Sequence, residues 1–291
     1  KNLDMPLREV LVLMGHSDGK DARECVRVKK ESVMKLLIEY SSQAVCSFCL
    51  AFSLFVCGAN PALAQQQGQD PDSFSWSVTP YLWASETKLD LTLGDRLSVG
   101  DTVSFNDLLD TLDTAVMVHV EGGKGNWSMF GDLTYLDMSD SNERELITID
   151  SDSEQTFLDA GAAYWPGGVG SNLSVLGGLR YSGFDDRYTF RAGGETIGTR
   201  RNKNDYYDAL IGVRYRFDLS ERWSLLTRAD YSFGDSEGIY LLNANFSVTV
   251  GKRRQNRILF GYQYKQAKFK DGDLRSDFTY YGPMAGFNFR C

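Results

Sequence analysis

The sequence contains few histidines and cysteines, two residue types that often serve in catalysis and metal binding. It has two histidines among 291 residues, and only His119 lies beyond residue 64. Of its five cysteines, only Cys291 lies beyond residue 64. A single cysteine cannot form an intramolecular disulfide, so we expect residues 65–291 to fold without one. We also predict no metal site and no cofactor.

Long apolar runs are missing as well. No stretch after residue 64 approaches the ~20 apolar residues that a membrane-spanning helix needs. This excludes a membrane helix there, but it does not exclude membrane-spanning strands, which need only about 9–11 residues. The formal charge of −8 disfavours nucleic acid as a partner.

The first 64 residues resemble a secretion signal preceded by an unrelated segment. A basic start at Met34-Lys35 runs into the apolar stretch 44–59, and Ala62-Leu63-Ala64 then precedes three glutamines. A basic start, a short apolar segment and an A-x-A site are typical of a signal peptide. We therefore predict an upstream segment 1–33 that is not part of the mature protein, a signal peptide 34–64 and a linker 65–73.

Signal cleavage between Ala64 and Gln65 is the first testable prediction. Mass spectrometry of the mature protein is expected to place the N-terminus at Gln65 or within two or three residues of it, because the A-x-A site ends at Ala64. A mature form that retains residues 1–33 would contradict the choice of Met34 as the start.

Beyond the linker, apolar and polar residues alternate. In 127–135 the odd positions are Trp, Met, Gly, Leu and Tyr, whereas Ser128, Asp132 and Thr134 lie between them. Segments 207–217 and 223–231 repeat the pattern. A period of two predicts strands with one apolar and one polar face. Such strands, with aromatic residues near both ends, are typical of a transmembrane β-barrel that is apolar toward lipid and charged toward its lumen.

We predict an all-β fold, a closed antiparallel transmembrane barrel at 74–291 with about ten strands, and eight or twelve as alternatives. The expected strands are 74–85, 114–122, 127–138, 154–165, 172–184, 205–217, 223–233, 239–250, 257–266 and 277–289. The expected longer loops are 86–113, 139–153, 185–204 and 267–276, and 88–103 could instead form a further hairpin. Within the first loop, Ser104 and the apolar spacing of Phe105, Leu108, Leu109 and Leu112 predict a short amphipathic helix.

Several motifs resemble a broad set of uncharacterised proteobacterial outer-membrane β-barrel proteins. The motifs are Pro80-Tyr81-Leu82-Trp83-Ala84, Ser104-Phe105-x-Asp107-Leu108-Leu109-x-x-Leu112, Gly212-Val213-Arg214-Tyr215 and Gly261-Tyr262-Gln263-Tyr264. The resemblance covers about 74–289 and implies the barrel fold and an outer-membrane location, but no catalytic residue or substrate. It also implies the barrel-assembly machinery as a partner. That machinery usually reads a terminal aromatic residue, whereas here Phe289 is followed by Arg290 and Cys291.

The predicted lumen face collects charges of both signs. Its members are Glu121, Asp132, Asp159, Arg180, Asp208, Arg214, Arg216, Arg228, Asp230 and Lys265. One interpretation is a lumen cross-linked by ion pairs, because buried charges need partners. The alternative is a narrow water-filled pore whose ion preference these charges set.

Other polar residues suggest little chemistry. His119 lies inside a predicted strand with no serine motif around it, so we expect a hydrogen-bonded lumen histidine and no catalytic residue. Asp150, Asp152 and Glu154 are expected to be solvated, although such carboxylates can hold divalent cations. Cationic side chains could contact lipopolysaccharide phosphates; these are Arg200, Arg201 and Lys203.

Aromatic residues near the strand ends predict interfacial girdles. They are Trp76, Trp127, Tyr135, Tyr164, Trp165, Tyr181, Tyr207, Tyr215, Trp223, Tyr231 and Tyr264. The function hypothesis is an outer-membrane barrel that is structural or forms a narrow pore for ions or small solutes, in contact with outer-membrane lipid and lipopolysaccharide. The alternatives are an outer-membrane enzyme acting on lipid or peptide at the rim, and a soluble periplasmic barrel that binds an apolar ligand. The sequence does not fix an oligomeric state.

Overall fold

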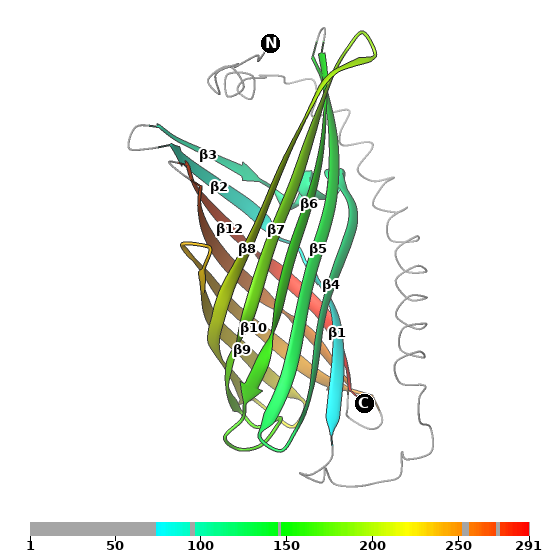
Figure 1. The fold of residues 1–291 in the computed structure, drawn as a ribbon. Helices are drawn as coiled ribbons and strands as arrows, with labels where there is room; N and C mark the ends of the chain where they lie inside the picture. Colours follow the sequence, from blue (N-terminus) through cyan, green and yellow to red (C-terminus); the bar gives the residue numbers. More distant parts are fainter. Residues whose placement is uncertain (1–73, 94–96, 145–146, 252–255, 272–273, 291) are drawn as a thin grey trace. The chain divides into compact units, whose positions relative to one another are not determined.

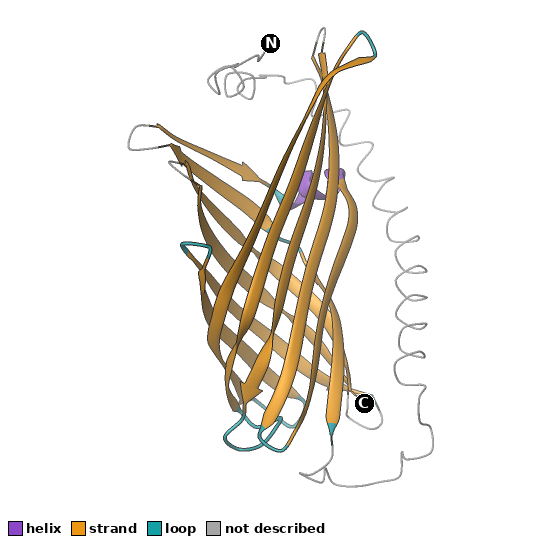
Figure 2. Cartoon of the chain, in the orientation of Figure 1, coloured by secondary structure: helices purple, strands orange, loops and turns teal. Residues whose placement is uncertain are grey.

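The computed structural model describes residues 74–93, 97–144, 147–251, 256–271 and 274–290. The described residues belong to one compact unit and are almost entirely β-strand, with one short helix, α3 (Phe105–Thr111) (Figures 1 and 2). No helix among these residues is long and apolar enough to cross a membrane. The predicted segments 1–33, 34–64 and 65–73, and with them the cleavage site, lie outside the described residues.

The strands follow the chain in order. They are β1 (Ser75–Trp83), β2 (Glu86–Leu93), β3 (Leu97–Val103), β4 (Leu112–Lys124), β5 (Trp127–Arg144), β6 (Ile147–Tyr164), β7 (Leu173–Ala192), β8 (Glu195–Asp218), β9 (Trp223–Gly234), β10 (Gly238–Val250), β11 (Asn256–Asp271) and β12 (Leu274–Arg290). Neighbours from β4 to β12 pair antiparallel, β1 pairs with β4, and β1 also pairs with β12. Ten strands therefore close into a ring, which confirms the predicted closed antiparallel barrel.

The strand β12 has two partners along one of its edges. Its C-terminal half pairs with β1, where Trp83 lies opposite Met284, and its N-terminal half pairs with β2, where Glu86 lies opposite Tyr281. The strand β3 then pairs with β2. Residues 86–103 thus form the hairpin that the sequence left as an alternative, and they extend the wall beyond the ten-strand ring (Figure 1).

The helix α3 forms where its sequence predicted it. The Ser104 side chain accepts a hydrogen bond from the Asp107 backbone N–H at 3.3 Å and donates one to the Asp107 carboxylate at 2.6 Å. The first of these bonds is an N-cap, which satisfies a backbone donor that the first turn leaves free. The helix contacts β5 and β2, so it lies between two parts of the sheet that do not pair with each other (Figure 2).

Three of the predicted loops are wrong. Segments 139–153 and 185–204 belong mostly to strands, and β8 alone runs for 24 residues. Segment 267–276 is likewise mostly strand. The alternation that marks a lipid-facing strand stops where the outward face becomes polar, whereas the backbone pairing does not need that pattern and continues. The long strands β5–β8 therefore project beyond the rest of the barrel (Figure 1).

Glycine is required at two kinds of position, in turns with a positive φ and where two strands approach each other closely. Gly125 (φ 61°) and Gly168 (φ 88°) occupy the left-handed region in short turns, where other residues are strained. Gly161 and Gly178 lie opposite each other on β6 and β7, and a Cβ on either would lie 2.2–2.3 Å from backbone oxygen of the facing strand. Close approach of β6 to β7 therefore requires glycine at both positions.

Candidate lumen site

Below the projecting part of β5–β8, the outward side chains of the barrel are mostly apolar, and the charges of the predicted lumen face point inward. Met129, Leu179 and Leu82 are 76%, 68% and 67% exposed, whereas Arg180 and Asp208 are each 1% exposed. Because side chains alternate along a strand, one phase faces lipid and the other faces the lumen. A soluble barrel that binds an apolar ligand needs the opposite arrangement, so this alternative is not supported. The chain has the architecture of an outer-membrane β-barrel.

The predicted girdle residues share the outward strand phase, with one exception. Exposed girdle members include Trp127, Tyr164 and Tyr207. Trp165 was predicted among them, but its indole N–H donates to the Ser128 hydroxyl at 2.8 Å, and its ring packs on a cluster that includes Phe130. Trp165 directly follows β6 in the inward phase of Phe157 and Asp159, so strand alternation itself turns it into the lumen.

Four of the predicted lumen residues form a balanced ion-pair group that we call the charge layer: Asp159, Arg180, Arg228 and Asp230. Arg180 donates to both Asp159 oxygens at 2.7 and 2.8 Å and to Asp230 at 2.9 Å. Arg228 donates to Asp230 at 2.6 Å and to Asp159 at 2.9 Å. Two cations thus bind two carboxylates from β6 and β9, which are not neighbouring strands, and no member is left as an unpaired buried charge.

A second polar group lies nearer the strand ends where β1 begins. Arg214 on β8 donates to Glu121 on β4 at 2.8 Å, so this pair spans the lumen. The His119 ring lies between two carboxylates, with Nδ1 2.9 Å from Asp132 and Nε2 3.4 Å from Glu121. The Tyr81 hydroxyl donates to Asp132 at 2.7 Å. Both ring nitrogens of His119 therefore face carboxylates, and neither forms a hydrogen bond with a hydroxyl of the described residues.

Among the described residues, the remaining three predicted lumen residues form no hydrogen bond or ion pair with either group. Asp208 accepts hydrogen bonds from the Ser236 backbone N–H at 3.0 Å and its hydroxyl at 2.6 Å, so it stabilises the turn between β9 and β10. Arg216 binds Asp218 and the Gly170 carbonyl at the mouth of the barrel. The Lys265 ammonium lies 3.4 Å from the centroid of the Phe157 ring, a cation–π contact.

Aromatic side chains fill the lumen on the other side of the charge layer, away from the strand ends where β1 begins. We call them the aromatic layer: Trp83, Phe157, Phe184, Tyr206, Phe269, Phe278 and Tyr280. The Phe184 and Phe278 rings stack at 5.7 Å, although β7 and β12 are on opposite sides of the ring of ten strands. Phe157 and Tyr280 meet edge to face, also at 5.7 Å. This layer was not predicted from the sequence. Phe157 and Phe184 share the strand phase of Asp159 and Arg180, however, and this phase is the signal that could have placed them inward.

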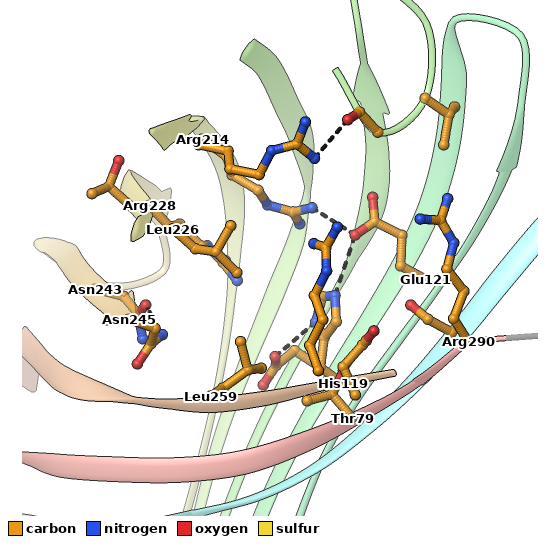
Figure 3. A pocket seen from close by; sticks show the side chains of 18 of the residues that line it. Thr79, His119, Glu121, Arg214, Leu226, Arg228, Asn243, Asn245, Leu259 and Arg290 are labelled. Carbon is orange, nitrogen blue, oxygen red and sulfur yellow. Dashed lines mark hydrogen bonds and ion pairs between the residues drawn. The ribbon is translucent and has the colours of Figure 1, made fainter. Parts of the chain in front are cut away.

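A cavity of about 290 Å³ lies between the charge layer and the strand ends where β1 begins, on the side away from the aromatic layer. We call it the vestibule. Its lining extends from Arg228 to Ser75 and Arg290 at the strand ends. Figure 3 shows Leu226, Asn243, Asn245 and Leu259 on one wall and His119, Glu121 and Arg290 on the other. The lumen is therefore hollow at the end where β1 begins and filled further in.

The projecting part of β5–β8 carries charges on its outer face. Asp150 binds Arg191 at 3.1 Å, and Asp185 forms a bidentate pair with Arg201, which lowers the pKa of Asp185. Asp152, Glu154, Arg200 and Lys203 are exposed. No group of three or more potential metal ligands is found among the described residues.

No family model and no curated protein matches the chain. Among solved structures, the outer membrane protease OmpT from Escherichia coli is 9% identical, with a TM-score of 0.41, over 78% of this chain and 99% of that chain. Ail, the attachment invasion locus protein of Yersinia pestis, is 12% identical (TM-score 0.34; 75% and 99% covered). The translocator domain of the autotransporter NalP from Neisseria meningitidis is 11% identical (TM-score 0.30; 86% and 97% covered). These likenesses extend no further than the barrel fold, which the strand pairing already establishes.

Proposed function

We propose that the chain is an integral outer-membrane barrel with a closed lumen, which anchors the projecting strands β5–β8 outside the bilayer. Short turns join β4 to β5 and β8 to β9 at the end where β1 begins and β12 ends. In outer-membrane barrels the short turns face the periplasm and the long connections face outward. The vestibule then opens toward the periplasm, and the projecting strands reach the cell surface, where Arg201 and Lys203 contact lipopolysaccharide phosphates.

The observation that carries this proposal is contact across the full width of the lumen. Lys265 on β11 meets Phe157 on β6, and Phe184 on β7 stacks on Phe278 on β12. Each pair joins strands that are five places apart in a ring of ten. A ten-stranded barrel is narrow compared with the 16–18-stranded porins that leave a water channel, so side chains suffice to fill it.

We do not assign an enzymatic activity to this barrel. Acyl transfer or hydrolysis by histidine needs a ring nitrogen within reach of the hydroxyl or water that it deprotonates. The ring of His119 instead bridges Asp132 and Glu121, and Ser128 donates its hydroxyl hydrogen to Glu121 at 2.6 Å. This arrangement supports a structural role for His119.

Planar-bilayer recording tests the closed lumen. The wild-type protein is expected to give no discrete conductance steps, because the charge layer and the aromatic layer block the lumen in series. The double variants Phe184→Ala/Phe278→Ala and Arg180→Ala/Asp230→Ala each open one layer and should remain silent. Only the fourfold variant is expected to conduct.

Two other results would contradict the closed barrel in different ways. Small steps from the wild type whose ion preference shifts in Arg180→Gln, Arg214→Gln or Arg228→Gln would establish the narrow pore instead. Large porin-like currents would exclude both the closed lumen and the narrow pore. Cleavage of lipid or peptide that is lost in His119→Ala would favour the enzyme alternative.

A further inference from the structure

The vestibule concentrates positive charge at its mouth. Arg257 and Arg290 line it and form no ion pair within 4 Å among the described residues. Arg216, which binds Asp218 at 2.9 Å, lies close enough to repel both, whereas Asp218 attracts Arg257 and Glu121 attracts Arg290. Like charges that converge at one opening oppose one another unless an anion lies between them. The mouth of the vestibule therefore attracts anions.

The carboxylates of the vestibule are already engaged by other side chains and offset this charge only in part. Glu121 accepts hydrogen bonds from Arg214 and Ser128, and Asp132 accepts one from Tyr81 and contacts His119. Arg214 uses only Nη1 in its pair, and its Nη2 is buried without a hydrogen-bond partner. Beside the deep part of the cavity, Arg214 thus has a buried nitrogen whose N–H groups lack a partner.

The opposite wall has a different chemistry. Leu226 and Leu259 present apolar surface, and Asn243 and Asn245 present amides beside them (Figure 3). Asn245 is 7% exposed, and its Oδ1 has no hydrogen-bond partner. A buried amide with a free acceptor is costly unless something binds it. The cavity therefore combines a basic side and an apolar side, and each side has one buried polar atom without a partner.

We propose that the vestibule binds a small organic acid. Its carboxylate lies between Arg257 and Arg290, and its apolar body lies along Leu226 and Leu259. Arginine forks match the two oxygens of a carboxylate, and ligand sites commonly join an apolar surface to a few polar groups. A volume of about 290 Å³ limits the ligand to about one aromatic ring or a short chain. The inference uses the barrel fold and does not depend on whether the lumen conducts.

Titration calorimetry on the full chain in a non-ionic detergent tests the site, with benzoate and benzamide as the probes. Benzoate is expected to bind saturably at one site. Benzamide has the same shape without the charge and should bind at least about tenfold more weakly, or about 1.4 kcal/mol. Arg257→Gln and Arg290→Gln, made separately, should each weaken benzoate binding by about tenfold. Arg222→Gln, in an exposed turn outside the cavity, is the matched control and should change nothing.

The apolar wall has its own test. Leu226→Asn should weaken benzoate binding several-fold and leave the weak binding of acetate unchanged, because only benzoate reaches that wall. Equal affinity for benzoate and benzamide would overturn the role of the arginines. Inorganic phosphate that displaces benzoate at equal concentration would overturn the organic-acid class, since the site would then be a general oxyanion patch. Absence of saturable binding by a correctly folded wild type would overturn the site itself, whatever the bilayer recordings show.

Discussion

Replacing Arg180 with methionine is expected to lower the free energy of unfolding by about 3–5 kcal/mol, the usual cost of breaking a buried ion pair from one side. Arg180 is 1% exposed and donates to both Asp159 and Asp230. Methionine fills much of the volume but leaves two buried carboxylates to share Arg228. Urea unfolding in detergent micelles, followed by tryptophan fluorescence, measures the change.

The double variant Arg180→Met/Asp230→Leu provides the control for charge balance. It leaves one cation, Arg228, and one carboxylate, Asp159, which are 2.9 Å apart. The double variant should therefore be more stable than Arg180→Met alone, although it carries one more substitution. Arg200→Met, at an exposed position of the projecting strands, should be close to wild type. If Arg180→Met and Arg200→Met unfold at the same urea concentration, the charge layer does not stabilise the barrel.

Replacing Ala229 with arginine should cost about 2–4 kcal/mol if the site lies near the bilayer midplane, because the new charge faces hydrocarbon. Ala229 lies on β9 between Val213 on β8 and Leu242 on β10, and all three belong to the outward phase. Unfolding of the protein reconstituted in lipid bilayers measures this cost, since the penalty depends on the lipid.

Leu226→Gln serves as the comparison on the same strand. Leu226 lines the vestibule, where a glutamine amide meets water and other amides, so the loss of stability should be much smaller. A larger loss for Leu226→Gln than for Ala229→Arg would mean that the barrel has the opposite face toward lipid. Equal losses in micelles and in bilayers for Ala229→Arg would mean that Ala229 does not contact hydrocarbon.

The alternation of apolar and polar residues predicted the barrel well, because within the membrane every second side chain faces lipid and the others face the lumen. Asp132 and Asp159 lie on the lumen side, as their strand phases predicted, and closure follows because an open sheet edge in lipid would leave N–H and C=O groups unsatisfied. The same rule predicted too few strand residues in β5–β8. Beyond the bilayer both faces meet water or protein, so the outward residues no longer need to be apolar.

The composition of the candidate site was predictable, but its pairing was not. A strand phase places Arg214 inward but does not say that Glu121, 93 residues earlier, is its partner, because that contact depends on barrel diameter and strand stagger. The same limit applies to Asp208, which faces inward and yet binds a turn. Trp165 has the inward phase of Asp159, so the phase rule places it in the lumen and its assignment to the girdle was wrong.

The shared edge of β12 has a consequence for how the protein reaches its native state. Tyr281 binds Glu86 at 2.6 Å across 195 positions, and Asn288 binds Thr79 at 2.7 Å across 209. Contacts between residues so distant in sequence are slow to form, because a long loop must close before they can stabilise the fold. Neither β1 nor β2 can find its place on that edge until β12 has been synthesised. Until then, both leave backbone hydrogen-bonding groups open to a chaperone or to a wrong strand.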